Sequence, residues 1–180
     1  MDFIDKNFKE ILSSEVISVI GGLIAGTMLA VYTNKILLIP GLLIVLPGFL
    51  EMRGNISGSF AARLSSGLFL GVIKPDNAMT KAVRGNFIAS FILVILISFV
   101  LGLMAFFFNF FMFHLVTPQI ILIPVIAGII ANMIEISLTF FATMYLFRKG
   151  HDPNNIMGPF VTSTGDVTSI LALLVALVII

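Results

Sequence analysis

Five long apolar runs dominate this chain, and they restrict its possible folds more than any other feature. A helix that spans a bilayer needs about 20 mostly apolar residues. Runs of this kind occupy residues 16–32, 36 to about 71, 87–113, 120–147 and 156–180. A transmembrane β-barrel would instead show alternating segments of about 10 residues. The sequence therefore predicts an all-α integral membrane protein with five transmembrane helices.

The composition agrees with a membrane protein and excludes several other classes. Of the 180 residues, 59% are hydrophobic and only 11% are charged, against about 25% charged residues in ordinary soluble proteins. The net charge of +1 provides no basic surface for nucleic acid. The chain has no cysteine, so disulfides and thiolate metal sites are excluded. It also has no HExxH, GxSxG or paired histidines, and we expect no enzymatic activity.

The basic residues indicate how the chain is oriented in the cell membrane. Cytoplasmic segments of membrane proteins carry an excess of Lys and Arg. With five spans, the N-terminus and the 2–3 and 4–5 loops share one side, and the other side has Lys35 alone. The first side holds seven basic residues: Lys6, Lys9, Lys74, Lys81, Arg84, Arg148 and Lys149. We therefore expect the N-terminus inside and the C-terminus outside.

The first 15 residues differ from the rest of the chain. Ile4, Phe8, Ile11 and Leu12 fall on one helical face, a pattern typical of a helix at a membrane interface. The predicted organisation is therefore a short amphipathic cytoplasmic segment, 1–15, followed by one membrane domain, 16–180.

The second apolar run is too long for a simple span. From Lys35 to Lys74 a straight helix would extend about 58 Å at 1.5 Å per residue, against a hydrocarbon core of about 30 Å. Pro40, the pair Pro47–Gly48, and the glycines at 54 and 58 are places where a helix could break. The sequence thus predicts a long, broken second helix, a feature on which transporter sites are often built.

Three acidic residues lie near the middle of these runs: Glu51, Glu135 and Asp166. Charges in hydrocarbon are costly, so such residues are functional candidates. Carboxylate, amide and hydroxyl oxygens suit Mg²⁺ or Ca²⁺ better than zinc or copper. A lone Asp among hydroxyl groups also fits a Na⁺ site or a proton relay, so this chemistry alone leaves the ion open.

Structural roles are the alternative for some of these residues. Glu51 could form an ion pair with Arg53 or Arg63 that stabilises the second segment. Glu135 lies near Asn132 in the sequence and could accept hydrogen bonds between helices. Asp166 has no basic residue nearby on its own segment, which favours a functional role for it.

Two motifs resemble a known family. Residues 46–55, LPGFLEMRGN, and 61–66, AARLSS, look like the first signature of solute-carrier family 41. The second signature is similar to residues 152–155, DPNN, the pair Gly158–Pro159, and 162–168, TSTGDVT. This last stretch also resembles the final membrane helix of MgtE magnesium channels. The resemblance covers nearly the whole chain.

This resemblance implies a pathway for divalent cations, chiefly Mg²⁺, at a twofold interface. By its match to the motif, Asp166 would bind the hydrated ion. Gly54 and Asn55 would lie near the same pathway, and Glu51 and Glu135 would line or flank it. Backbone carbonyls near Thr162 would add ligands. Because the chain has one five-span unit, we expect a homodimer in the lipid bilayer.

The expected function is therefore a dimeric channel that carries Mg²⁺ down its electrochemical gradient as the transported ion, with no separate cofactor. The alternative within transport is a Na⁺- or H⁺-coupled Mg²⁺ exchanger. A purely structural membrane subunit is the alternative from another class, and it predicts that no ion flux exists.

Overall fold

The chain folds into a bundle of five helices, which a computed structural model describes for residues 5–76 and 78–180. The helices are α1 (Lys6–Ile36), α2 (Leu42–Phe69), α3 (Lys81–Phe113), α4 (Gln119–Arg148) and α5 (Pro153–Ile179). The predicted all-α class with five helices is confirmed. The predicted interfacial segment 1–15 begins with residues 1–4, including Ile4, which lie outside the described residues. From Lys6 onward it is the first part of α1 and continues without interruption into the first apolar run.

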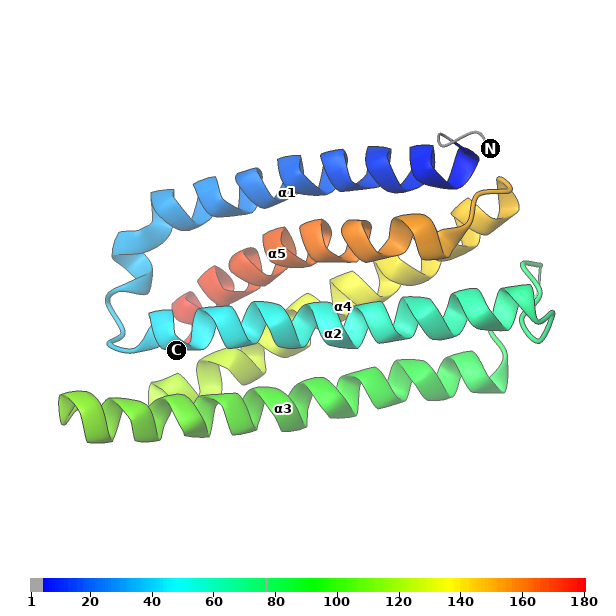
Figure 1. Cartoon of the computed structure of the whole chain (residues 1–180). Coiled ribbons are helices and arrows are strands. Elements are labelled where there is room, and N and C mark those ends of the chain that lie inside the picture. The colour runs from blue at the N-terminus through cyan, green and yellow to red at the C-terminus, as the bar shows by residue number, and fades with distance from the viewer. Residues whose placement is uncertain (1–4, 77) are drawn as a thin grey trace.

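Four of the five helices are long and apolar enough to cross a membrane, namely α1, α3, α4 and α5. Figure 1 shows α2 running alongside them, between α3 and α5. The polar residues Glu51, Arg53 and Arg63 on α2 lower its hydropathy. With 28 residues, α2 would be about 42 Å long at 1.5 Å per residue, so it has the length of a span.

The second helix differs from the sequence prediction, because no break is present within it. The chain leaves the helical path at Leu37, turns through Gly41 with a positive φ of 82°, and enters α2 at Leu42. The helix then continues through Pro47, Gly54 and Gly58 to Phe69. Ile36 belongs to α1, and the next five residues form the turn. The helix α2 is therefore shorter than the predicted run and needs no break. Pro47 lies only in the second turn, where one hydrogen bond is lost.

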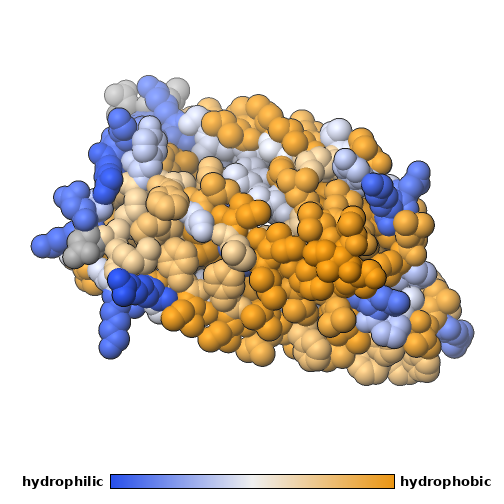
Figure 2. All heavy atoms as spheres, turned by 180° about the vertical axis from the view of Figure 1, so that it is seen from behind, coloured by the Kyte–Doolittle hydropathy of each residue, from blue (hydrophilic) through white to orange (hydrophobic). Residues whose placement is uncertain are grey.

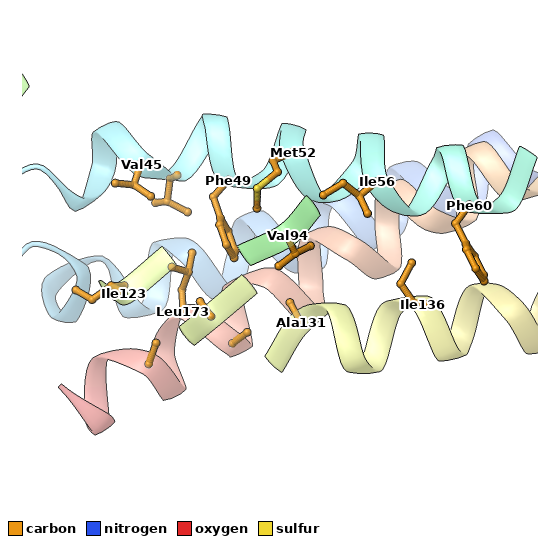
Figure 3. Packing of buried hydrophobic residues seen from close by; sticks show 14 of the residues in the cluster. Val45, Phe49, Met52, Ile56, Phe60, Val94, Ile123, Ala131, Ile136 and Leu173 are labelled. Carbon is orange, nitrogen blue, oxygen red and sulfur yellow. The ribbon is translucent and has the colours of Figure 1, made fainter. Parts of the chain in front are cut away.

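Buried apolar residues hold α2 against α3, α4 and α5. Val45, Phe49, Met52, Ile56 and Phe60 occur at intervals of three or four residues, so they form one face of α2. They are all buried. Figure 3 shows this face directed toward a set of side chains from the other helices, Val94, Ile123, Ala131, Ile136 and Leu173.

The two ends of the bundle carry different connections (Figure 1). The N-terminal end of α1, the α2–α3 connection and the α4–α5 connection lie at one end, and the C-terminus lies at the other. The basic residues that we assigned to one side of the membrane therefore share one end of the molecule. Figure 2 shows hydrophilic residues at both ends and a hydrophobic surface between them. This surface is the arrangement expected for contact with lipid.

The first helix, α1, packs chiefly against one neighbour. Its contacts are chiefly with α5, which also packs against α2 and α4. A Cβ added at Gly21 would lie 2.5 Å from Cβ of Ser163, so the two helices approach closely at that glycine. α5 therefore lies between α1 on one side and α2 and α4 on the other.

Candidate ion site between α2 and α5

A groove of about 480 Å³ lies between α2 and α5. Five of the six site residues that the sequence predicted line it, and only Glu135 does not. Its walls are Pro47, Leu50, Glu51, Gly54, Asn55 and Gly58 from α2, and Gly158, Val161, Thr162, Gly165 and Asp166 from α5. The spacing of three and four residues on each helix explains why these residues share a face. The structure thus brings two distant motifs together in one cavity.

The acids of the groove are available to a ligand. Asp166 stands midway along α5 and is partly exposed, and its carboxylate makes no hydrogen bond or ion pair with another described residue. Glu51 is exposed, and its Oε1 accepts a long hydrogen bond of 3.4 Å from Nδ2 of Asn55. An exposed hydroxyl, that of Thr162, lies on the same groove. The groove therefore presents carboxylate, amide and hydroxyl oxygens together.

Glycines keep the groove open. A Cβ added at Gly54, Gly58 or Gly158 would meet no atom within 4 Å. Side chains at these positions would project into open space and narrow the groove. A second hollow of about 170 Å³ shares Gly58 and Gly158 with the first, and it continues between α2 and α5 toward the α4–α5 connection. Sequence reasoning did not identify this continuation, although the four-residue spacing of the small residues Gly54, Gly58 and Ala62 indicated it.

Glu135 lies elsewhere, fully buried on α4. Its Oε1 is 3.0 Å from the Thr164 hydroxyl and its Oε2 is 3.2 Å from the Thr168 hydroxyl. Both threonines belong to α5, so Glu135 accepts hydrogen bonds between helices. This arrangement corresponds to the structural alternative that the sequence left open for this residue.

Arg53 does not pair with Glu51. These two residues are separated by about 200° around α2, since each residue turns an α-helix by about 100°. Arg53 is 1% exposed and donates from Nη1 to Oδ1 of Asn132 on α4, at 3.0 Å. Among the described residues neither Arg53 nor Arg63 lies within 4.0 Å of the Glu51 carboxylate. The ion pair between Glu51 and Arg53 or Arg63, which the sequence left open, is therefore not formed among the described residues.

The groove of one chain provides some of the oxygen ligands that a cation site needs. Within residues 5–76 and 78–180, no three His, Asp or Glu side chains come close enough to enclose a metal ion. Two acids from different helices face one open groove instead. Such a site suits a cation that keeps its water shell, as Mg²⁺ usually does.

Comparison with known proteins adds independent information on this site. Residues 46–176 match the family MgtE, which is described as a divalent cation transporter. The matched range includes the whole groove, from Pro47 to Asp166. A comparison with curated proteins gives no match.

Proposed function

Because the chain belongs to the MgtE family of divalent cation transporters, we propose that it carries hydrated Mg²⁺ across the membrane along the α2–α5 groove. One observation carries this proposal: the groove gathers Glu51, Asn55, Thr162 and Asp166 near the middle of the bundle. In this proposal Asp166 binds the ion through its water shell. Glu51 and Asn55 flank the ion on the opposite wall, and carbonyl oxygens near Thr162 and Gly54 contribute further acceptors.

The functional unit in this proposal is a homodimer. The groove of one chain is open on one side and offers too few ligands to enclose an ion. A second copy related by a twofold axis would supply a second Asp166 opposite the first. A ring of acids attracts cations and conducts them when each contact is weak enough to release the ion.

The proposed topology has five spans, with α2 inside the bundle as the fifth. The end that bears seven basic residues faces the cytoplasm, in agreement with the positive-inside rule. The small-residue hollow between Ala61 and Asn154 then lies on the cytoplasmic side of Asp166. Mg²⁺ would leave the groove through this hollow.

The mode of transport in the proposal is a channel, with a coupled exchanger as the alternative. We would reconstitute the purified chain into proteoliposomes that contain a Mg²⁺-sensitive dye and impose only a membrane potential. Voltage alone is expected to drive Mg²⁺ entry. Entry that requires a Na⁺ or pH gradient would favour the exchanger. No entry under any gradient would contradict the transport proposal.

A matched control makes this experiment specific to the groove. Asp76 lies in the α2–α3 connection, is exposed and is 3.8 Å from Arg148. Asp76→Asn removes one acid from the chain without touching the groove, and it is expected to transport Mg²⁺ at the rate of the original protein.

A further inference from the structure

The hydrogen bonds of Glu135 fix one face of α5. Thr164 and Thr168 are four residues apart, so their side chains project from the same side of the helix. Both hydroxyls lie within 3.2 Å of the Glu135 carboxylate. Asp166 is two residues from each threonine, which is about 200° around the helix. When the threonines face α4, Asp166 therefore faces away from α4, and it lines the groove.

The hydroxyls have competing acceptors on their own helix. Thr164 Oγ1 is 2.7 Å from the Phe160 carbonyl, and Thr168 Oγ1 is 2.9 Å from the Thr164 carbonyl. Each hydroxyl has one proton, and an ionised carboxylate is a stronger acceptor than a neutral carbonyl. The Glu135 carboxyl oxygens therefore compete with the carbonyls of α5 for these protons, and the bonds to Glu135 link α5 to α4.

A buried arginine joins α2 to the same part of α4. Arg53 on α2 is almost completely buried, and among the described residues it forms no ion pair within 4.0 Å of the Glu135 carboxylate. It bonds to Asn132, one turn from Glu135 on α4. Glu135 thus connects α4 to α5 from the side of α5 away from Asp166, and Arg53 connects α2 to the same part of α4.

We propose that Glu135 is a positioning residue, which holds α5 in the rotation that directs Asp166 into the groove. Glu135 then acts on the ion through Asp166 and does not bind it. The link to Mg²⁺ rests on the proposed function, whereas the rotation of α5 can be measured without transport.

The absence of native cysteines allows single cysteines to report this rotation. Thr162→Cys places a thiol on the groove face, which is exposed, and Ser169→Cys places one on the inner face, where Ser169 is fully buried. We would measure the rates at which a small water-soluble methanethiosulfonate reagent labels each thiol in the reconstituted protein. The labelling ratio is the rate for Thr162→Cys divided by the rate for Ser169→Cys. A high ratio means that the Thr162 face of α5 lies toward the groove.

The test variants remove the interhelical hydrogen bonds while conserving shape. Thr164→Val combined with Thr168→Val removes both hydroxyls, and Thr164→Ser combined with Thr168→Ser keeps them. The valine pair is expected to lower the labelling ratio about tenfold, the effect of losing two such bonds in a membrane protein. The serine pair is expected to retain the original ratio. Glu135→Gln, the second variant, is expected to lower the ratio in the same direction if the valine pair does not fold.

Controls separate positioning from general loosening and from ion binding. Thr139 lies one turn from Glu135, is fully buried, and its hydroxyl has no partner among the described residues, so Thr139→Val should leave the ratio unchanged. An unchanged ratio in folded Glu135→Gln would overturn the proposal. The labelling is also measured with Mg²⁺, which is expected to protect the Thr162→Cys thiol. If Glu135→Gln keeps the labelling ratio but loses this protection, Glu135 is a ligand, and the proposal is overturned. These readouts hold even if the native protein shows no Mg²⁺ flux, which would contradict only the proposed function.

Discussion

At the scale of single residues, surroundings distinguish the acids of the bundle. Glu135 is buried and accepts hydrogen bonds from two threonines, whereas Asp166 is partly exposed and has no partner among the described residues. An acid at membrane depth is costly unless it faces water, a partner or an ion. Asp166 faces a groove, so a cation is the partner that its position favours. Its chemistry can be tested by removing only its charge.

The substitution Asp166→Asn is expected to reduce Mg²⁺ entry about tenfold to hundredfold at low Mg²⁺ concentration. This range corresponds to the loss of one hydrogen-bonded contact to a charged group. The proposed dimer should remain intact, because Asp166 makes no hydrogen bond or ion pair with another described residue. Dye-reported flux and size-exclusion chromatography measure the two effects. Normal Mg²⁺ entry through Asp166→Asn would show that the site assignment is wrong.

Two glycines are expected to respond differently to the same small substitution. A Cβ at Gly102 on α3 would lie 2.6 Å from the carbonyl oxygen of Ile121 and 2.7 Å from its Cα, whereas a Cβ at Gly22 would meet no atom within 4 Å. Gly102→Ala must push the backbones of α3 and α4 apart and should lower the stability by about 1–3 kcal/mol. Gly22→Ala, the control, should be neutral or slightly stabilising. The melting temperature in detergent measures both, and equal effects would contradict the close helix crossing.

At the scale of elements, α1 is fastened at its beginning. Glu10 is 8% exposed, and its carboxylate is 2.8 Å from Nδ1 of His151 and 3.0 Å from Nδ2 of Asn155. Lys6 donates to the carbonyl of Gly150 at 2.6 Å. These contacts join α1 to the α4–α5 connection and to the first turn of α5. Since α1 packs chiefly on α5, this cluster determines how firmly its first turns are held.

Acidification is expected to loosen the first turns of α1. Glu10 precedes the apolar run that begins at residue 16, and the hydrogen bond from the Asn155 side chain lowers the pKa of Glu10 below its ordinary value of 4.5, with a smaller contribution from His151. A lowered pKa in the folded state stabilises the ionised form. The stabilisation is therefore complete above pH 4.5 and declines as the pH falls through the lower, folded-state pKa.

Hydrogen–deuterium exchange, corrected for intrinsic rates, measures this loosening. Exchange in the first three turns of α1 should increase below pH 4.5 in the original protein. Glu10→Gln should exchange faster already at pH 7 and lose the pH dependence. Glu15 is exposed, so Glu15→Gln is the matched control and should behave as the original protein. Equal exchange in both variants would show that the Glu10 contacts do not hold α1.

At the scale of the whole molecule, the bundle is closed on one side of α2 and open on the other. The closed side is the apolar packing against α3 and α4 (Figure 3), and the open side is the groove. Polar residues at membrane depth require a partner or water. In the proposed dimer, a second copy of the chain would face this groove, meet the requirement and complete the ion site.

The homodimer proposal predicts which positions can be cross-linked. Asn55 lies on the groove, and in a dimer built around it the two Asn55 positions approach each other near the axis. Asn55→Cys is expected to form a disulfide-linked dimer on oxidation, since such bonds need Cα atoms within about 7 Å. Ile92 on α3 is 52% exposed and lies away from the groove, so Ile92→Cys should remain monomeric on a non-reducing gel. Cross-linking at residue 92 but not at residue 55 would place the interface elsewhere.

The sequence by itself determined the number of helices and the order of polar residues along them. Apolar runs between charges predicted five helices, and counting along them placed Glu51, Glu135 and Asp166 at mid-depth. The motifs also predicted that Gly54, Asn55 and Thr162 belong to one site. The prediction of five helices is confirmed, because the length of an apolar run is set by the thickness of the hydrocarbon core, whereas the ion site stays a prediction.

Only the tertiary structure decided how each helix is rotated. It directs Asp166 into the groove, Glu135 toward Thr164 and Thr168, and Arg53 toward α4. It also shows Gly21 at the contact with α5, whereas no described atom lies within 4 Å of a Cβ added at Gly22. The physical reason is that lipid tails are as apolar as a protein core, so hydropathy does not distinguish the faces of a membrane helix. Their rotation depends on close packing and on hydrogen bonds between helices, which exist only once the bundle has formed.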